Sequence, residues 1–130
     1  MVDKVDHLVL LSHDPGGLHA FFTQTLGLPA AWPFNDYGSF ASGGVYTGNT
    51  NLECIRFGAD SPFQLPGEGS AVFGLVFEPS GALADITGEL QARGAAPGRP
   101  QDQVGGPPDQ PVKLWTSLFL DALCTDSYVI

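Results

Sequence analysis

Two residues whose side chains can do chemistry lie inside apolar runs of the sequence. His7 lies in the run over residues 4–11, and Glu53 lies in the run over residues 51–57. A carboxylate within a buried strand needs a partner, because an unpaired buried charge is costly, and for Glu53 that partner is His7 or Arg56. A His–Glu pair in a cleft also forms an acid–base couple, so both residues are candidate catalytic residues. The alternative is a purely structural pair.

Six aromatic residues are candidates for the wall of a small-molecule pocket: Trp32, Phe34, Tyr37, Phe40, Tyr46 and Trp115. Aromatic walls with a few polar groups are the usual make-up of such pockets. Trp115 shares a predicted strand face with Phe119, so one of these two can face the same cavity. The alternative for most of the aromatic residues is packing within the core.

The other histidines and the cysteines have simpler interpretations. His13 lies in a turn beside Asp14, where we expect it to be solvated. His19 falls off the apolar stripe of its predicted helix, so we expect it to be exposed. Cys54 and Cys124 fit reduced thiols better than a disulfide framework, and Cys54 is predicted to be a small buried side chain.

The elements that must position the two candidate catalytic residues are strands. Strand alternation over residues 4–11 places His7 on one face with the other odd-numbered residues, which are all apolar. Alternation over residues 51–57 likewise places Glu53 on one face with Ile55 and the other odd-numbered residues.

A helix and short strands are predicted between these two strands. Asp14 followed by proline is typical of a helix start, and Gly27 is typical of a helix stop, which predicts a helix over residues 15–26. Short strands are expected at residues 37–41 and 44–46.

The second half of the chain repeats this order. Its predicted elements are a loop (58–69), a strand (70–78), a helix (79–93), a Gly/Pro-rich loop (95–111), a strand (113–121) and the start of another strand (127–130). The two halves superpose at an offset of about 67 residues. The sequence therefore predicts a single α+β domain in which two βαβββ modules, about 1–58 and 70–130, form a curved mixed sheet. We expect the last strand to be only half present.

Composition and charge exclude several classes of function. The chain has 130 residues, of which 43% are hydrophobic, enough for the core of one domain. Five Lys and Arg face 14 Asp and Glu, a formal charge of -9, so neither nucleic acid nor a membrane surface is an expected partner. The acidic balance favours neutral or cationic ligands. Because the opening apolar run is too short for a signal peptide, we expect a cytoplasmic protein.

Three motifs resemble those of a known superfamily. They are the opening strand V-D-H-L-V-L, the helix ending L-G-L at residues 26–28, and the N-x-E strand at residues 51–53. With the second strand–helix unit at residues 71–94, they make the whole chain similar to the vicinal oxygen chelate superfamily, which includes glyoxalase I, bleomycin-resistance proteins and extradiol dioxygenases. The resemblance implies paired modules whose sheets curve into a cup around a ligand or metal.

The resemblance also implies a divalent metal (Zn, Fe, Mn or Ni) held by His7 from the first strand and Glu53 from the fourth. The second module departs from this pattern. Gly74 stands at the position that matches His7, and only Asp121 and Asp126 lie near the position that matches Glu53. Two ligands make a poor metal site, so either water, substrate or a partner chain completes it, or no metal is bound.

Three functions remain open from the sequence. The first is a metal-assisted lyase, isomerase or dioxygenase that acts through His7 and Glu53 on a substrate with vicinal oxygens. The second is a metal-free protein that sequesters a small molecule, as the bleomycin-resistance type does. The third is a degenerate, non-catalytic member. A homodimer is expected in each case, because open sheets leave edges and concave surface to cover.

Overall fold

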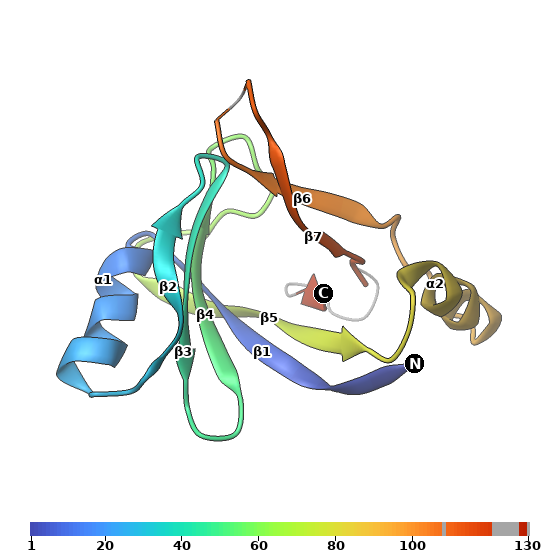
Figure 1. Ribbon diagram of the computed structural model, residues 1–130, viewed down its shortest axis with the longest axis horizontal. Coiled ribbons are helices and arrows are strands. Elements are labelled where there is room, and N and C mark those ends of the chain that lie inside the picture. Colours follow the sequence, from blue (N-terminus) through green and yellow to red (C-terminus); the bar gives the residue numbers. More distant parts are fainter. Residues whose placement is uncertain (108, 121–127, 130) are drawn as a thin grey trace.

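A computed structural model describes residues 1–107, 109–120 and 128–129. Six strands form one mixed sheet in the order β2-β3-β4-β1-β5-β8, and β6 and β7 form a separate hairpin. The six-stranded sheet curves, and the hairpin lies across from β1 and β5 (Figure 1). The predicted α+β fold with a curved mixed sheet is confirmed.

The centre of the sheet is β1 (Val2–Ser12), which pairs in parallel with β4 (Asn51–Phe57) and antiparallel with β5 (Ser70–Pro79). All three strands were predicted, and β1 and β5 are slightly longer than expected. Cys54 and Ile55, which point to opposite faces of β4, are both buried, whereas the first residues of β1 and both ends of β5 are exposed. The buried core on the concave side includes Val9 and Ile55.

The first helix differs from the prediction in its second half. Helix α1 (Pro15–Ala20) starts as expected, because the Asp14 side chain accepts a hydrogen bond from the backbone of Gly17 at 2.9 Å. It then continues as a π-helical turn, η1 (Phe21–Thr25), instead of an α-helix. The wider turn rotates the expected apolar stripe out of register, so that Phe21 is 47% exposed.

One strand of the first half was missed by the sequence prediction. Strand β2 (Ala30–Asp36) lies at the edge of the sheet, where Pro33 is tolerated because an edge strand needs no partner on its outer side. The two short strands predicted at 37–41 and 44–46 are one continuous strand, β3 (Phe40–Tyr46). The residues from 37 to 39 form the turn before it.

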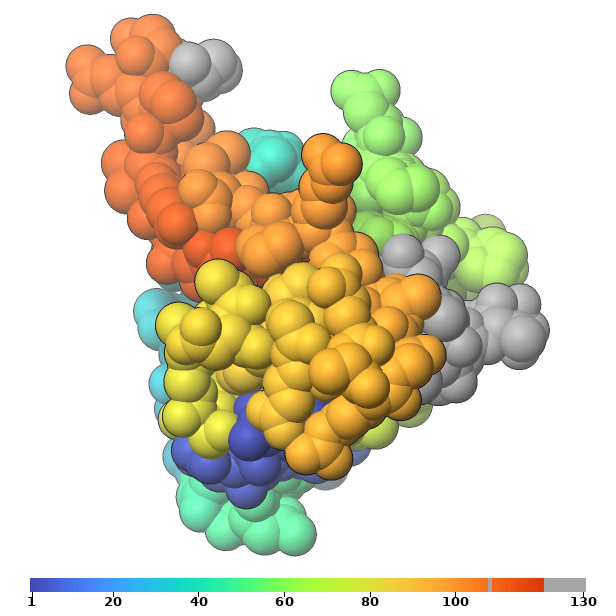
Figure 2. Space-filling model, turned by 90° about the vertical axis from the view of Figure 1, so that its right-hand side faces the viewer, coloured from blue at the N-terminus to red at the C-terminus, as the bar shows by residue number. Residues whose placement is uncertain are grey.

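The second half contains helix α2 (Leu83–Ala92), β6 (Gln101–Gly105), β7 (Val112–Ser117) and β8 (Tyr128–Val129). The predicted helix is confirmed, and β7 covers only the first part of the predicted strand 113–121. Figure 2 shows α2, in yellow to gold, spread over this side of the molecule above the blue N-terminal residues. Within the described ranges, no helix is long and apolar enough to cross a membrane.

The ladder between β1 and β5 has an approximate two-fold symmetry. Leu8 pairs with Leu75 at its centre, His7 pairs with Val76 on one side, and Val9 pairs with Gly74 on the other. These pairs place Gly74 at the position related by symmetry to His7, as the sequence offset predicts. The same symmetry relates two register shifts in this ladder. One lies at Asp6 of β1, between Val5 and His7, and the other lies at Phe73 of β5, opposite Val9 and Leu10.

Candidate functional site

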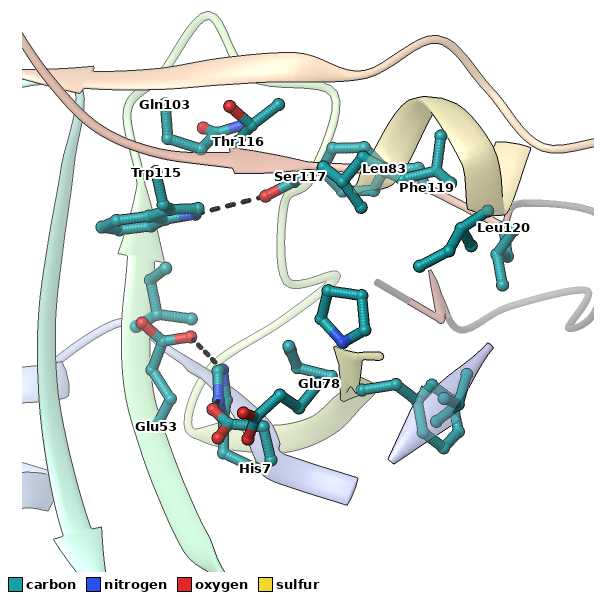
Figure 3. Close-up of a pocket in the computed structure, with 18 of the residues that line it drawn as sticks. His7, Glu53, Glu78, Leu83, Gln103, Trp115, Thr116, Ser117, Phe119 and Leu120 are labelled. Carbon is teal, nitrogen blue, oxygen red and sulfur yellow. Dashed lines mark hydrogen bonds and ion pairs between the residues drawn. The ribbon is translucent and has the colours of Figure 1, made fainter. Parts of the chain in front are cut away.

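A cavity of about 660 Å³ lies on the concave side of the sheet. Its lining comes from the strands of both halves and from α2, with apolar side chains in the majority. In Figure 3, His7 and Glu53 lie on one wall, Trp115 and Ser117 lie across from them, and Leu83 of α2 lies near Phe119. The cavity therefore lies in the cup that the resemblance implied.

The polar end of this cavity is a row of four bonded side chains, here called the Asp6–His7–Glu53–Ser42 cluster. His7 Nδ1 lies 2.7 Å from Asp6 Oδ2, and His7 Nε2 lies 3.2 Å from Glu53 Oε2. The Ser42 hydroxyl donates to Glu53 Oε1 at 2.5 Å. The structure thus brings together the two residues that the sequence selected, and adds a second carboxylate and a hydroxyl.

Strand pairing explains how His7 and Glu53 meet. Because β1 and β4 are parallel neighbours, with His7 beside Asn51 and Val9 beside Glu53, the two side chains project from adjacent strands on the concave face. Ile55 and Phe57 line the same cavity, which confirms the predicted face of the strand.

Asp6 reaches the cluster because of a backbone irregularity. Regular alternation would place Asp6 on the face opposite His7. The register shift between Val5 and His7 leaves Asp6 without a partner on β5, and such bulges change the direction of a side chain. In the sequence, the position of Asp6 directly before His7 within an apolar run is the one feature that could have marked it as part of the site. Ser42 has no comparable feature.

The electrostatics of the cluster favour a charged imidazole. Burial acts to lower the pKa of His7, but hydrogen bonds to Glu53 and Asp6 and the charges of these carboxylates outweigh it, so the pKa is raised. With His7 protonated, the two carboxylates leave the cluster with a net negative charge. Burial and the nearby charge of Glu53 raise the pKa of Cys54 to about 11, which makes this buried thiol unreactive.

Three of the six aromatic pocket candidates line the cavity: Trp32, Tyr37 and Trp115. The Trp32 ring lies edge-on to His7 with 5.6 Å between ring centroids, and its indole N–H donates to Ser42 at 3.4 Å. This position depends on Gly44 in the neighbouring strand, where a Cβ atom would overlap the Trp32 ring. The Trp115 indole donates to Ser117 at 3.2 Å (Figure 3).

The other three aromatic candidates lie outside the lining of this cavity. Phe40 is buried in the core, and its ring lies edge-to-face against Trp115 with 5.5 Å between the ring centroids. Phe34 packs against His19, and the Tyr46 hydroxyl donates to the carbonyl of Gly48 at 2.5 Å. Phe119, named as an alternative to Trp115, also lines the cavity.

The two remaining histidines lie away from the cavity. His13 is exposed, as expected, and its ring hydrogen-bonds to the carbonyl of Gly67. The expectation that His19 is exposed is wrong. It is half-buried with Nε2 3.2 Å from the carbonyl of Gly44, because the absence of a side chain at Gly43 leaves room for its ring.

The donor set around His7 and Glu53 does not fit a metal site. Within residues 1–107, 109–120 and 128–129, no three His, Cys, Asp or Glu side chains form a group that could hold a metal. Gly74 supplies no donor at the position that matches His7. The pairing of β5 with β8 makes Tyr128 the counterpart of Asn51 and Val129 the counterpart of Leu52, so the position that matches Glu53 lies outside the described residues. Asp121 and Asp126 lie outside the described residues.

Comparisons with known proteins bear on the fold. No protein-family model matches the chain. A curated glucokinase of Cupriavidus pinatubonensis is 38% identical over 89 residues, which are 65% of this chain and 26% of that protein. The chain thus spans about a quarter of the length of the curated relative that it matches.

Solved structures match nearly the whole chain. Methylmalonyl-CoA epimerase from Mycobacterium tuberculosis has a TM-score of 0.70 at 14% identity, covering 98% of this chain and 85% of that one. A hypothetical protein from Bacillus halodurans C-125 has a TM-score of 0.68 at 16% identity, covering 97% and 90%. Streptomyces coelicolor methylmalonyl-CoA epimerase, in complex with 2-nitronate-propionyl-CoA, has a TM-score of 0.63 at 13% identity, covering 99% and 95%.

These likenesses define the class of fold. The chain has the paired βαβββ fold of the vicinal oxygen chelate superfamily, and the resemblance stated from its sequence is confirmed at that level. At such low identity the likeness shows the fold alone, and it assigns no activity.

Proposed function

We propose that this protein binds a small, mainly apolar organic molecule in the cup and that it does so without a metal. The observation that carries the proposal is the cavity itself, which has apolar walls and one polar end, the Asp6–His7–Glu53–Ser42 cluster. Its volume of about 660 Å³ lies within the range of small-molecule sites, and few, convergent polar groups are typical of them.

Tryptophan fluorescence can test this proposal directly. The chain has two tryptophans, Trp32 and Trp115, and both line the cavity. A ligand that enters the cup should therefore change the intrinsic fluorescence, with no signal from tryptophans elsewhere. We expect saturable quenching or enhancement with diphenylpropanol, an uncharged probe that is transparent at the red edge of tryptophan absorption.

Two substitutions on the same strand separate binding in the cup from binding elsewhere. Val76 lines the cavity, whereas Val72 of the same strand is 68% exposed and lies outside the lining. Val76→Phe should weaken diphenylpropanol at least about fivefold, because added bulk occupies the ligand's space. Val72→Phe adds the same bulk outside and should change little. Equal effects of the two variants, or no saturable signal at all, would contradict the proposal.

A second candidate function is proton transfer at a carbon next to a carbonyl group. The observation that favours it is a carboxylate, Glu53, with an 11% exposed side chain at the end of a largely apolar cavity, bonded to His7. In this reaction, Glu53 takes the proton and returns one to the same carbon. The test is deuterium exchange at the carbon next to the carbonyl of phenylacetone in heavy water, followed by NMR. Exchange that is no faster than in buffer, or that persists in Glu53→Gln, rejects this candidate.

A further inference from the structure

We infer that the cup selects an organic cation, an ammonium group carried on an aromatic or branched apolar body, with the ammonium against Asp6 and Glu53 and the body along Trp115. The inference rests on the proposed function, because it names the class of ligand for the same cavity. It adds a definite orientation, in which the charged end of the ligand faces β1 and β4 and the apolar end faces α2.

The charges that line the cavity are the first support. They are the three carboxylates of Asp6, Glu53 and Glu78, the imidazole of His7 and the α-amino group of Met1. Glu78 is paired with Lys4 at 3.0 Å on the surface. The Asp6–His7–Glu53–Ser42 cluster therefore keeps a net negative charge even when His7 is protonated, and a cation in the cup restores neutrality there.

Cationic side chains elsewhere in the described residues do not alter this balance. Arg93 pairs with Glu89 at 2.6 Å, and Lys113 pairs with Asp102 at 2.7 Å. Neither these residues nor Arg56 belongs to the lining of the cavity. An anionic ligand would therefore enter a cavity that is lined by three carboxylates. Its counter-charges among the described lining residues are the imidazole of His7, already bonded on both nitrogens, and the α-amino group of Met1.

Asp6 is the carboxylate best placed to meet the ammonium. Its side chain is 39% exposed, compared with 14% for His7 and 11% for Glu53. A ligand can thus reach Asp6 while the bond between His7 and Glu53 stays intact. A hydrogen bond between an ammonium and a carboxylate is among the stronger polar contacts in proteins, so removing this charge should have a clear effect.

The opposite wall suits the rest of a cationic ligand. Trp115 lies across the cavity from Glu53 (Figure 3) and is 43% exposed, so part of its surface is free to contact a ligand. The Phe40 ring packs against the Trp115 ring with 5.5 Å between the centroids, and the Trp115 indole N–H donates to the Ser117 hydroxyl. The face of an indole attracts cations as well as apolar groups, so the wall favours an aromatic or alkylated amine.

This ligand class differs from the one named for two of the structural neighbours. Those proteins are described as methylmalonyl-CoA epimerases, one of them in complex with 2-nitronate-propionyl-CoA. A CoA ester carries several phosphate charges. The ligand inferred for this cup carries the opposite charge.

Isothermal titration with three matched probes tests the inference: diphenylpropylammonium, diphenylpropanol and diphenylpropanoate. They share one apolar body and differ in the charge of one terminal group. We expect the cation to bind about tenfold or more tightly than the alcohol, since charge-assisted hydrogen bonds exceed neutral ones. The carboxylate should bind more weakly than the alcohol.

A pair of charge-neutralising variants locates the effect. Asp6→Asn should weaken the ammonium probe about tenfold and leave the alcohol within about twofold, which also shows that the cup is still folded. Asp60→Asn removes the same charge from an exposed loop outside the cavity, and at physiological salt it should change neither affinity by more than about twofold.

The outcomes separate this inference from the proposed function. Equal affinity for the ammonium and the alcohol, or tighter binding of the carboxylate, overturns the inference and leaves the proposed binding function standing. An equal loss of ammonium affinity in Asp6→Asn and Asp60→Asn also overturns it, because the preference would then come from overall charge. If none of the three probes binds, the proposed function fails, and the inference fails with it.

Discussion

The two halves of this protein share one backbone plan and differ in the side chains that they send into the cup. Around the β1–β5 ladder, His7 of the first half corresponds to Gly74 of the second. Asp6, at the register shift in β1, corresponds to Phe73 of β5. The first half supplies the polar end of the cavity. At the corresponding positions, the second half supplies the buried ring of Phe73 and, at Gly74, no side chain.

This difference shows how a symmetric frame makes an asymmetric site. A bulge turns one extra side chain toward the concave face in either half, whatever that side chain is. With Asp6 the bulge adds charge to the cavity, and with Phe73, which is 9% exposed, it adds apolar packing to the core. A ligand with one polar and one apolar end fits such a cup in a single orientation.

The largest predicted effect on stability comes from removing the buried aromatic side chain of the second half. Phe73→Ala should lower the free energy of unfolding by about 3–5 kcal/mol, because it removes a buried ring that contacts Phe57 and Phe63. Asp6→Ala, at the corresponding position, should cost less than about 1 kcal/mol, because its side chain is 39% exposed. Urea denaturation measures both, and equal costs would contradict the assigned roles.

A smaller effect is expected when the first half is made to resemble the second. Glu53→Leu should lower the free energy of unfolding by about 3 kcal/mol, because His7 and Ser42 lose the acceptor that satisfies them. Replacing both His7 and Glu53 by Leu should recover at least half of that loss, because no buried charge is then left without a partner and the remaining carboxylate, Asp6, is partly exposed. Additive costs in the double variant would show that the two residues are not coupled.

The third effect is the pH dependence of stability, which should come from His7 in the first half. It should be smaller than the two losses of stability above. The pKa of His7 is raised in the folded state, so the pairing contributes fully below the unfolded value near 6.5 and is lost as pH rises through the folded value. The stability difference between the wild type and His7→Gln should therefore shrink from about pH 6 to pH 9. Denaturant titrations across this range measure it. A stability difference that grows with pH would contradict the pairing of a protonated His7 with Glu53 and Asp6. In a Glu53→Gln background, the difference should depend less on pH.

The smallest expected effect concerns metal removal. Since the second half places Gly74 where a further ligand would be needed, treatment with a chelator should leave the affinity for diphenylpropanol unchanged. Elemental analysis of the purified protein provides the parallel measurement. Stoichiometric metal, lost in His7→Ala together with ligand affinity, would show that donors outside the described residues complete a site.

Several parts of the fold and site could be predicted from the sequence because their causes are local. The apolar runs predicted β1, β4 and β5, and Asp14 and Gly27 predicted the limits of the first helical segment. Alternation within β4 predicted that Glu53 and Ile55 share the cavity face. A carboxylate and an imidazole within two apolar strands marked the candidate site.

Tertiary structure decided the features whose causes lie far apart in the chain. Strand β2 contains Pro33, and only its place at the sheet edge makes that residue acceptable. The position of Trp32 in the cup depended on Gly44 of the next strand, where a Cβ atom would overlap its ring. Asp6 entered the site through a register shift against β5. The sequence alone thus determined which residues needed partners, because the apolar run around a polar residue is a local property of the chain. Which partners they met was decided by the pairing of distant strands, because that pairing sets the direction of each side chain.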